Sequence, residues 1–256
     1  MILAVDIGNT NIVTGIKKED WYTGRIETVL GEPASFYQSK IKEWLSPVGS
    51  DKIEQVVVSS VVPSLTPVIL ETLDLVTKIS PILIGQKVYD QLPISIENKN
   101  EIGTDLVCNS LAAFNLFKSD CMVIDFGTAL TFTVILDAKI VGVNIAPGIK
   151  TALKSLTTNA AQLNDIPLEL PDAIIGKNTT TALQSGILWG YVGLVERMIE
   201  RIEAEVGKPL KVAATGGLSH VLEPLKDKFD VVDRNLTLEG ILQMSSYMDQ
   251  TNSSPK

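Results

Sequence analysis

The sequence predicts an α/β protein made of two related halves, and two observations lead to this prediction. Short runs of apolar and β-branched residues alternate with longer segments whose apolar residues recur at helical spacing, a pattern that favours sheets covered by helices. In addition, a strand, an Asp-x-Gly turn and a second strand follow one another twice, at residues 1–16 and 122–136. We therefore expect an N-terminal domain over residues 1–119 and a C-terminal domain over residues 120–256.

The first half is expected to open with a meander of three short strands, because each is apolar or alternates between apolar and polar residues. A run of β-branched residues then predicts a buried strand, and three segments with amphipathic spacing predict helices. The stretch 86–102 is polar and irregular. The expected strands are 1–5, 11–16, 22–28, 55–62 and 81–84, and the expected helices are 33–45, 65–77 and 103–117.

The second half repeats this plan. The segment 185–206 predicts the longest helix, since residues such as Leu188, Val195 and Ile199 recur at helical spacing. The polar tail 249–256 is expected to fray. The expected strands are 122–125, 131–136, 140–146, 211–214 and 229–232, and the other expected helices are 149–163 and 238–248.

The repeated turn is suited to holding phosphate groups. Asp6-Ile7-Gly8-Asn9-Thr10 ends the first strand of one half, and Asp125-Phe126-Gly127-Thr128-Ala129 ends the first strand of the other. Because glycine has no side chain, its backbone can approach an anion closely, and a carboxylate oxygen is a ligand that Mg²⁺ prefers. Two such turns facing each other would hold a nucleotide polyphosphate from both sides. Thr215-Gly216-Gly217, after a later strand, offers a third contact for a base or ribose.

Composition and charge exclude several other classes of protein. The net charge of −8 and the sequence pI of about 4.8 argue against a duplex-DNA binder, so a nucleic-acid partner is not expected. No apolar run approaches the ~18 residues of a membrane span, and the first residues lack a basic leader, so we expect a cytoplasmic protein without a membrane partner. The single histidine argues against a His-centred triad, and Cys108 and Cys121 are expected to be reduced core residues.

Segments along the whole chain resemble the type III pantothenate kinase family, which lies within the actin, hexokinase and Hsp70 superfamily and includes proteins first described as Bvg accessory factors. The matching segments are DIGNTN at 6–11, VVVSSVVP at 56–63, GTD at 103–105, NSLAAF at 109–114, DFGTALTF at 125–132, Gly176-Lys177-Asn178-Thr179 and Thr215-Gly216-Gly217. The resemblance implies two related actin-like (ribonuclease H-like) domains with a nucleotide cleft between them.

The resemblance also implies an activity, namely ATP-dependent phosphorylation of pantothenate to 4′-phosphopantothenate, the first step of coenzyme A biosynthesis. It implies Mg²⁺ with the ATP, and a monovalent cation, K⁺ or NH₄⁺. Asp6 would lie near the Mg²⁺–ATP, Thr128 would contact ATP, and Asp125 corresponds to the position that binds the monovalent cation. The residues that match the first ATP-binding loop are Asp6, Ile7, Gly8, Asn9, Thr10, Asn11, Ile12 and Val13.

On the acceptor side, Asp105 corresponds to the general base that takes the proton of the pantothenate hydroxyl. The family is homodimeric and its second subunit completes the pantothenate pocket, so a homodimer is implied as well. The positions that match pantothenate contacts are Gly103, Thr104, Asp105, Leu106 and Thr179.

The acceptor side departs from the family pattern at several positions. Leu106 stands where the family usually has Arg, and Ile96 and Lys99 stand where it usually has Tyr and Pro. Leucine cannot bind a carboxylate as a guanidinium does. One alternative is therefore a non-catalytic nucleotide-binding regulator, a Bvg accessory factor-like pseudokinase with a decayed pantothenate site, and another is a kinase with a different small acceptor. Asp105 could also be only a first-turn helix carboxylate, and Thr179 only a helix N-terminal residue.

Overall fold

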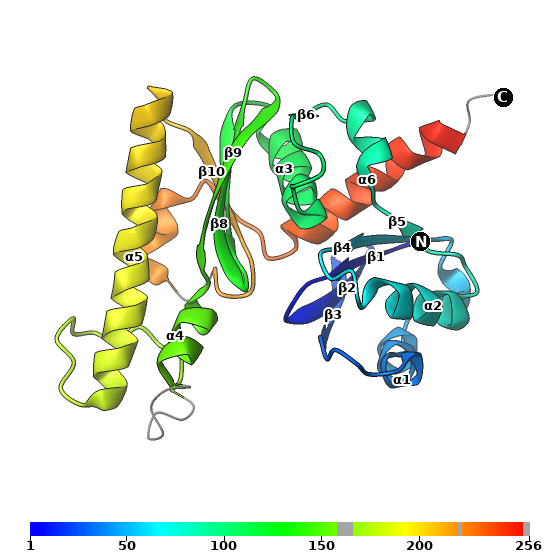
Figure 1. Cartoon of the computed structure of the whole chain (residues 1–256), viewed down its shortest axis with the longest axis horizontal. Coiled ribbons are helices and arrows are strands. Elements are labelled where there is room, and N and C mark those ends of the chain that lie inside the picture. Colours follow the sequence, from blue (N-terminus) through cyan, green and yellow to red (C-terminus); the bar gives the residue numbers. More distant parts are fainter. Residues whose placement is uncertain (158–165, 220–221, 253–256) are drawn as a thin grey trace. The chain divides into compact units, whose positions relative to one another are not determined.

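Two units make up the computed structural model of the chain, which describes residues 1–157, 166–219 and 222–252 (Figure 1). The first unit joins Met1–Asn115 to Asn235–Lys256, and the second is Leu116–Arg234. The chain first passes from one unit to the other between Asn115 and Leu116, and the sequence predicts a boundary after residue 119. The C-terminal segment differs from the prediction, which ran the second domain to residue 256, because α6 (Leu236–Asn252) packs against strands of the first unit.

A mixed five-stranded sheet lies at the centre of the first unit, in the order β3-β2-β1-β4-β5. The central strand β1 pairs antiparallel with β2 on one side and parallel with β4 on the other, and β3 and β5 continue each pattern outward. The strands are β1 (Ile2–Ile7), β2 (Asn11–Lys17), β3 (Trp21–Glu27), β4 (Gln55–Ser60) and β5 (Ile82–Leu83). Four predicted strands thus lie within two residues of their expected bounds, and β5 is shorter.

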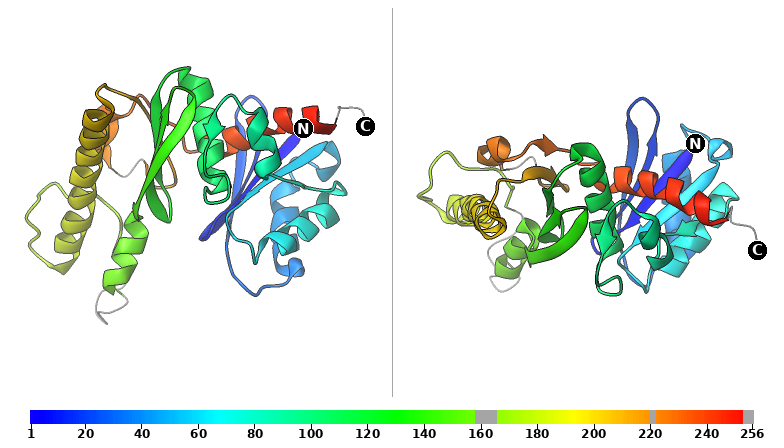
Figure 2. Two further views of the ribbon diagram at one scale, coloured as in Figure 1. Left: turned by 45° about the horizontal axis from the view of Figure 1, so that its top comes forward. Right: turned by 90° about the horizontal axis from the view of Figure 1, so that it is seen from above.

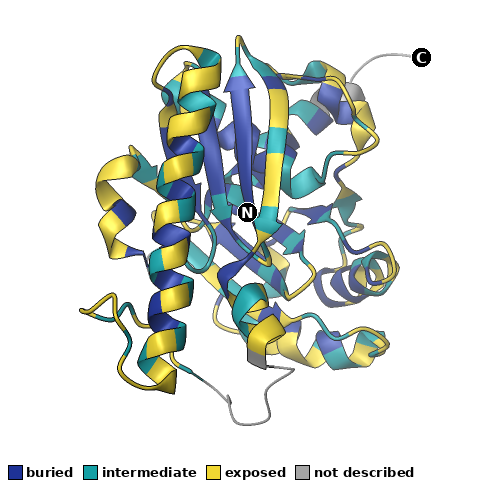
Figure 3. Cartoon of the chain, turned by 60° about the vertical axis from the view of Figure 1, so that its left-hand side comes forward, coloured by how far each residue is buried: buried dark blue, intermediate teal, exposed yellow. Residues whose placement is uncertain are grey.

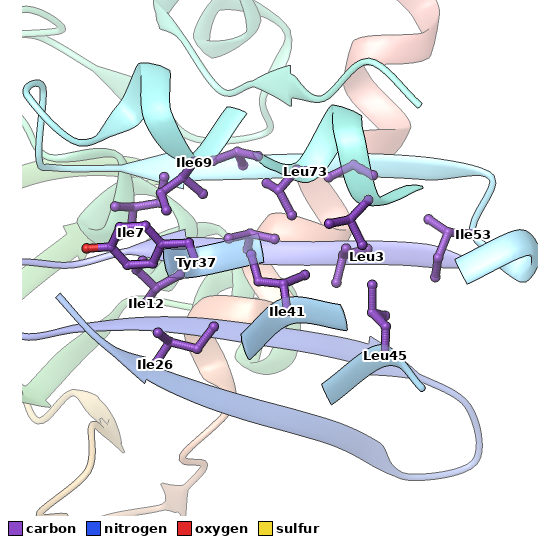
Figure 4. Packing of buried hydrophobic residues seen from close by; sticks show 14 of the residues in the cluster. Leu3, Ile7, Ile12, Ile26, Tyr37, Ile41, Leu45, Ile53, Ile69 and Leu73 are labelled. Carbon is purple, nitrogen blue, oxygen red and sulfur yellow. The ribbon is translucent and has the colours of Figure 1, made fainter. Parts of the chain in front are cut away.

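Helices cover both faces of this sheet, with α1 and α2 on one face and α6 across the other (Figures 1 and 2). Successive side chains of β1 point to opposite faces of the sheet, so Leu3, Val5 and Ile7 all point to the face that α1 and α2 cover. These three side chains are fully buried. They pack in one cluster with Tyr37 of α1 and Ile69 of α2 (Figure 4). The helices and short elements of the unit are α1 (Ala34–Leu45), α2 (Thr66–Thr77), α3 (Thr104–Phe117), η1 (Ser50–Lys52), η2 (Gln86–Gln91) and β6 (Ser95–Ile96).

A close approach of two helices explains why α6 belongs to the first unit. A Cβ atom on Gly240 of α6 would collide with the backbone of Cys108 in α3, so this contact requires glycine. Beside it, Thr237 Oγ1 lies 2.9 Å from Asn109 Oδ1, and Asn115 Nδ2 donates to Gln243 Oε1 at 2.7 Å. The leucine, isoleucine and methionine side chains of α6 that are buried here are Leu236, Leu238, Ile241, Met244 and Met248.

The second unit repeats the strand plan of the first, as the duplicated motif predicts. Its strands follow the order β11-β10-β7-β8-β9, in which β7 pairs antiparallel with β8 on one side and parallel with β10 on the other. β9 and β11 continue the two patterns outward, as β3 and β5 do in the first unit. The strands are β7 (Cys121–Phe126), β8 (Ala129–Leu136), β9 (Lys139–Pro147), β10 (Lys211–Thr215) and β11 (Val231–Val232).

The long helix α5 (Thr179–Val206) covers one face of these strands. Its residues Leu188, Val195 and Ile199 are buried in a cluster with Met122 and Ile124 of β7, and its opposite side is exposed, as the blue and yellow bands of Figure 3 show. The unit also contains α4 (Ile149–Thr157) and η3 (Glu223–Lys228). The predicted continuation of α4 over 158–163 lies outside the described residues.

Some elements differ from the sequence prediction. Helix α5 begins six residues before the expected 185, and the segment 86–102 contains η2 and β6, with Val88, Tyr89, Ile94 and Ile96 buried. Helix α6 continues to Asn252, past the predicted start of the frayed tail, of which residues 253–256 lie outside the description. None of the helices in the described ranges has the length and apolar character to cross a membrane.

Candidate active site

The first Asp-x-Gly turn is the tip of the β1–β2 hairpin in the first unit. Gly8 N donates to Asn11 O at 3.0 Å, and Thr28 Oγ1 and N donate to Gly8 O at 2.7 Å and Thr10 O at 3.0 Å. These bonds fix the backbone of the turn, while Asn9 and Thr10 are exposed at its tip. The turn therefore offers a rigid, accessible stretch of backbone of the kind that binds phosphate.

Two hydroxyl residues, Ser59 and Thr104, lie near Asp6 and Asp105 in the first unit. Asp6 is paired with Ser59 in the parallel ladder, so the two side chains lie on the same face of the sheet. Ser59 Oγ lies 2.9 Å from Thr104 Oγ1, and Thr104 Oγ1 also lies 3.1 Å from both N and O of Ser60. Thr104 thus fixes the N-terminus of α3 to the end of β4, and Asp105 follows directly.

Asp105 is held in a partly buried position. Its Oδ1 accepts a hydrogen bond from Leu106 N at 2.8 Å, and a Cβ on Gly103 would collide with that oxygen. Burial raises the pKa of Asp105, and the bond from the Leu106 N–H opposes this shift. A carboxyl group with a raised pKa is a stronger proton acceptor once it is ionised, which suits a general base.

The buried thiol of Cys108 lies one turn further along α3. Burial raises its pKa, and the negative charges of Asp6 and Asp105 raise it further. Burial also raises the pKa of Tyr89, with smaller contributions from Cys108 and Asp105. Asp6 and Asp105 therefore both lie close enough to Cys108 to act on the same thiol.

The second Asp-x-Gly turn is the tip of the β7–β8 hairpin and is held by the Pro147-Gly148 turn. Gly127 N donates to Ala129 O at 3.1 Å, and Gly148 N and Thr151 Oγ1 donate to Thr128 O at 3.0 and 2.7 Å. A Cβ on Gly148 would collide with the backbone of this turn. As in the first unit, the backbone is fixed while the side chain of Thr128 is exposed.

The Thr215-Gly216-Gly217 turn lies against Asp125 in the second unit. Gly216 has a φ of 92°, and a Cβ there would lie 2.5 Å from Asp125 Oδ1. Only glycine combines this left-handed backbone with so close an approach. The predicted third contact and the second phosphate turn are therefore adjacent.

Two threonines flank Asp125 within the sheet. It is paired with Thr131 on β8 and with Thr215 on β10, and both threonine hydroxyls are buried without a hydrogen-bond partner among the described residues. One carboxylate and two hydroxyls form a donor set that fits a hard cation. No cluster of three His, Cys, Asp or Glu side chains occurs in the described ranges, so the donor set differs from a carboxylate cage.

Comparison with known proteins now identifies the family. A family model described as type III pantothenate kinase matches residues 2–201. A type III pantothenate kinase from Geobacillus sp. (strain WCH70) is 40% identical over 250 residues, which cover 94% of this chain and 95% of the relative. The type III pantothenate kinase of Moorella thermoacetica (strain ATCC 39073 / JCM 9320) is 39% identical over 249 residues, which cover 94% of this chain and 97% of the relative. The chain belongs to the type III pantothenate kinase family.

Solved structures agree on the fold. A Campylobacter jejuni protein assigned to the Baf family of transcriptional activators superposes with a TM-score of 0.59 at 20% identity, over 97% of this chain and 99% of that one. The activator of 2-hydroxyisocaproyl-CoA dehydratase from Clostridium difficile, with bound ADPNP, gives 0.56 at 11% identity, over 100% and 98%. At these identities the likeness concerns the two-domain actin-like fold, which confirms the predicted fold class.

The structure distributes the predicted type III pantothenate kinase residues over both units. The first unit holds residues 6–13 and 103–106, and the second holds Asp125, Thr128 and Thr179. Thr179 is exposed as the first residue of α5, directly after the Asn178 cap. Leu106 is half-buried, Ile96 is buried, and Lys99 forms an ion pair with Asp90.

Sequence reasoning missed the polar side chains that support these residues. Strand pairing brings three of them beside the two aspartates. Ser59 and Thr215 lie on strands that are distant along the chain from Asp6 and Asp125, and Thr131 faces Asp125 across the β7–β8 hairpin. A signal was present, since Ser59, Thr131 and Thr215 all lie inside motifs that carry the resemblance.

Proposed function

We propose that this chain phosphorylates pantothenate with ATP to give 4′-phosphopantothenate, the first step of coenzyme A biosynthesis. The observation that carries the proposal is the match to the type III pantothenate kinase family over residues 2–201, with relatives at about 40% identity along nearly the whole chain. The arrangement in the first unit supports it, because Ser59 is paired with Asp6 in the ladder and bonds to Thr104, which directly precedes a carboxyl group of raised pKa.

Each unit has a distinct task in this proposal. We assign contacts with ATP phosphates to the fixed backbone of residues 6–13 in the first unit and to the exposed Thr128 in the second. Asp105 accepts the proton of the pantothenate hydroxyl as the γ-phosphoryl group arrives, and Gly103, Thr104, Leu106 and Thr179 hold the acceptor. Catalysis by such residues rests on positioning and on stabilisation of charge.

The carboxylates Asp6 and Asp125 are the residues we assign to cations. Asp6 would hold the Mg²⁺ of the bound ATP, and Asp125, with Thr131 and Thr215 beside it in the sheet, would bind K⁺ or NH₄⁺. When bound, these cations neutralise negative charge on the phosphates. The homodimer and the cytoplasmic location that the sequence implies stay predictions.

A coupled assay tests the proposal directly. The protein is incubated with ATP, Mg²⁺, K⁺ and pantothenate, and ADP formation is followed with and without pantothenate. We expect pantothenate-dependent turnover. A folded protein that forms no ADP above background would refute the proposal.

The regulator alternative finds no support in the relatives, which are named as kinases. Because the acceptor side departs from the family pattern, we test this alternative by measuring the binding of ATP and of pantothenate by calorimetry. Nucleotide binding without pantothenate binding would favour a regulator or a different acceptor, and a panel of small alcohols separates those two outcomes. Leu106→Arg, assayed in parallel, restores the charge that the family usually has at this position.

A further inference from the structure

Asp125 is flanked by two threonines whose hydroxyl groups lack hydrogen-bond partners within the described part of the chain. Residues paired directly across neighbouring strands point to the same face, so the side chains of Thr131 and Thr215 lie on either side of the Asp125 carboxylate. Thr215 is 1% exposed and Thr131 is 9% exposed. Buried hydroxyls are normally hydrogen-bonded, so two such exceptions beside one carboxylate require an explanation.

The first unit provides an internal comparison, because it has the same strand plan. There the equivalent aspartate, Asp6, is paired with Val13 and Ser59. Val13 is apolar, and the hydroxyl of Ser59 is satisfied by Thr104 Oγ1 at 2.9 Å. The unsatisfied hydroxyls are therefore specific to the second unit and are not a consequence of the strand arrangement.

Two glycines keep the surroundings of Asp125 free of further side chains. A Cβ on Gly216 would lie 2.5 Å from Asp125 Oδ1, and a Cβ on Gly127 would lie 3.5 Å from the same oxygen. The carboxylate is thus bordered by backbone on one side and by the two threonines within the sheet. Oxygen atoms are the only side-chain donors that this row of the sheet presents beside Asp125.

We propose that Thr131 and Thr215 supply hydroxyl oxygens to a monovalent cation bound at Asp125. This inference builds on the proposed function, which assigns the cation to Asp125. One carboxylate charge balances one positive charge, and neutral hydroxyl oxygens add ligands for a hard cation without adding charge. The cation site would then consist of Asp125 on β7, Thr131 on β8 and Thr215 on β10.

The experiment measures the thermal unfolding of the whole protein as K⁺ replaces choline at constant ionic strength, without pantothenate. The variants are Thr131→Val and Thr215→Val, which keep the shape of the side chain and remove the hydroxyl. Thr133→Val is the matched control, since its hydroxyl is also buried and unsatisfied among the described residues but its partner on β7 is Val123. Asp125→Asn serves as the variant without the charge.

We expect K⁺ to raise the unfolding temperature of the wild type, and each of the two threonine variants to need at least tenfold more K⁺ for half of the effect. Thr133→Val should respond as the wild type does, and Asp125→Asn should not respond. All three valine variants should fold at least as well as the wild type without K⁺, because each removes an unsatisfied buried hydroxyl.

An unchanged K⁺ response in Thr131→Val and Thr215→Val would overturn the inference, as would a wild type that does not respond to K⁺ or a Thr133→Val variant that is equally impaired. A response to Mg²⁺ in place of K⁺ would overturn the choice of a monovalent cation. The coupled assay separates this result from the proposed function. Pantothenate-dependent turnover with unaffected threonine variants contradicts only the inference. A wild type that responds to K⁺ but shows no turnover, together with threonine variants that lose the response, contradicts only the proposed function.

Discussion

At the scale of single residues, Asp105 combines burial with a hydrogen bond that keeps its carboxylate oriented. Burial raises its pKa, while the Leu106 N–H at 2.8 Å stabilises the ionised form and points Oδ1 toward the start of α3. A base of this kind is stronger than an exposed aspartate and is less fully ionised in acid. Both properties can be measured.

Replacing Asp105 by Asn removes the proton acceptor and keeps the shape of the side chain. We expect kcat for pantothenate phosphorylation to fall by about 10²- to 10⁴-fold, the usual contribution of a general base. The coupled assay measures this loss, and circular dichroism checks that the variant is folded. Activity within twofold of the wild type would exclude Asp105 as the base.

The same substitution changes how stability depends on pH. Because the folded state raises the pKa of Asp105 above its ordinary value of 3.8, the folded protein binds more protons than the unfolded chain between the two values, and stability falls as pH rises through that window. Asp105→Asn should therefore be more stable than the wild type above the window and equal to it below pH 3.8. Urea unfolding at several pH values tests this, and a variant that is less stable at neutral pH would contradict it.

At the scale of elements, Thr104 joins the end of β4 to the start of α3. Thr104→Val removes its bonds to Ser59 and Ser60, so we expect the free energy of unfolding to fall by about 1–3 kcal/mol. Thr104→Ser keeps the hydroxyl and is the matched control. Equal stability of the two variants in urea unfolding would show that these bonds are dispensable.

The N-terminus of α5 carries a capping box that places Thr179. Asn178 Oδ1 accepts from Thr181 N at 2.9 Å, so Asn178→Ala should lower the free energy of unfolding by about 1 kcal/mol. Thr180→Ala, at an exposed neighbouring position, should leave it within ~0.5 kcal/mol of the wild type. Urea unfolding with an unchanged denaturant dependence checks both values.

The elements that the sequence predicted well are those in which local pattern and tertiary burial agree. The apolar runs of β1, β4 and β7 are buried, and their bounds lie close to the predicted ones. The N-terminal part of α5 was missed because its first turn, residues 179–182, is mostly polar and exposed, so hydrophobic spacing gives no signal there. β6 was missed because a two-residue strand carries too little pattern.

The candidate site shows the same division. The turns at Asp6 and Asp125 follow from local sequence, since strand, glycine and aspartate are adjacent along the chain. Contacts that depend on strand register, such as Ser59 beside Asp6 and Thr215 beside Asp125, join residues distant in sequence and could not be predicted from spacing. The family resemblance supplied the roles of residues but not these neighbours.

At the scale of the whole molecule, the second unit is inserted into the first, because α6 returns to the strands of the first unit. Gly240 is the point of closest approach, so Gly240→Ala should lower the stability of the first unit by about 1–3 kcal/mol through overpacking against Cys108. Hydrogen exchange should become faster in β1, β4 and α3 and remain unchanged in β7 and β8.

A matched control for this variant lies in the second unit. Gly190 is exposed in α5 and a Cβ there meets nothing within 4 Å, so Gly190→Ala should stabilise the protein by about 0.5–1 kcal/mol. If Gly240→Ala instead accelerates exchange equally in both units, the two units do not unfold separately.

The insertion has a consequence for synthesis on the ribosome. A chain emerges at about 5–20 residues per second, so every strand of the second unit has been made before α6 exists. Lys17 Nζ must then reach Glu239 Oε2, 222 positions away along the chain, to form their 2.6 Å ion pair. The strands of the enclosed unit can therefore begin to pair before α6 exists, whereas β1, made early, waits for α6 to cover it.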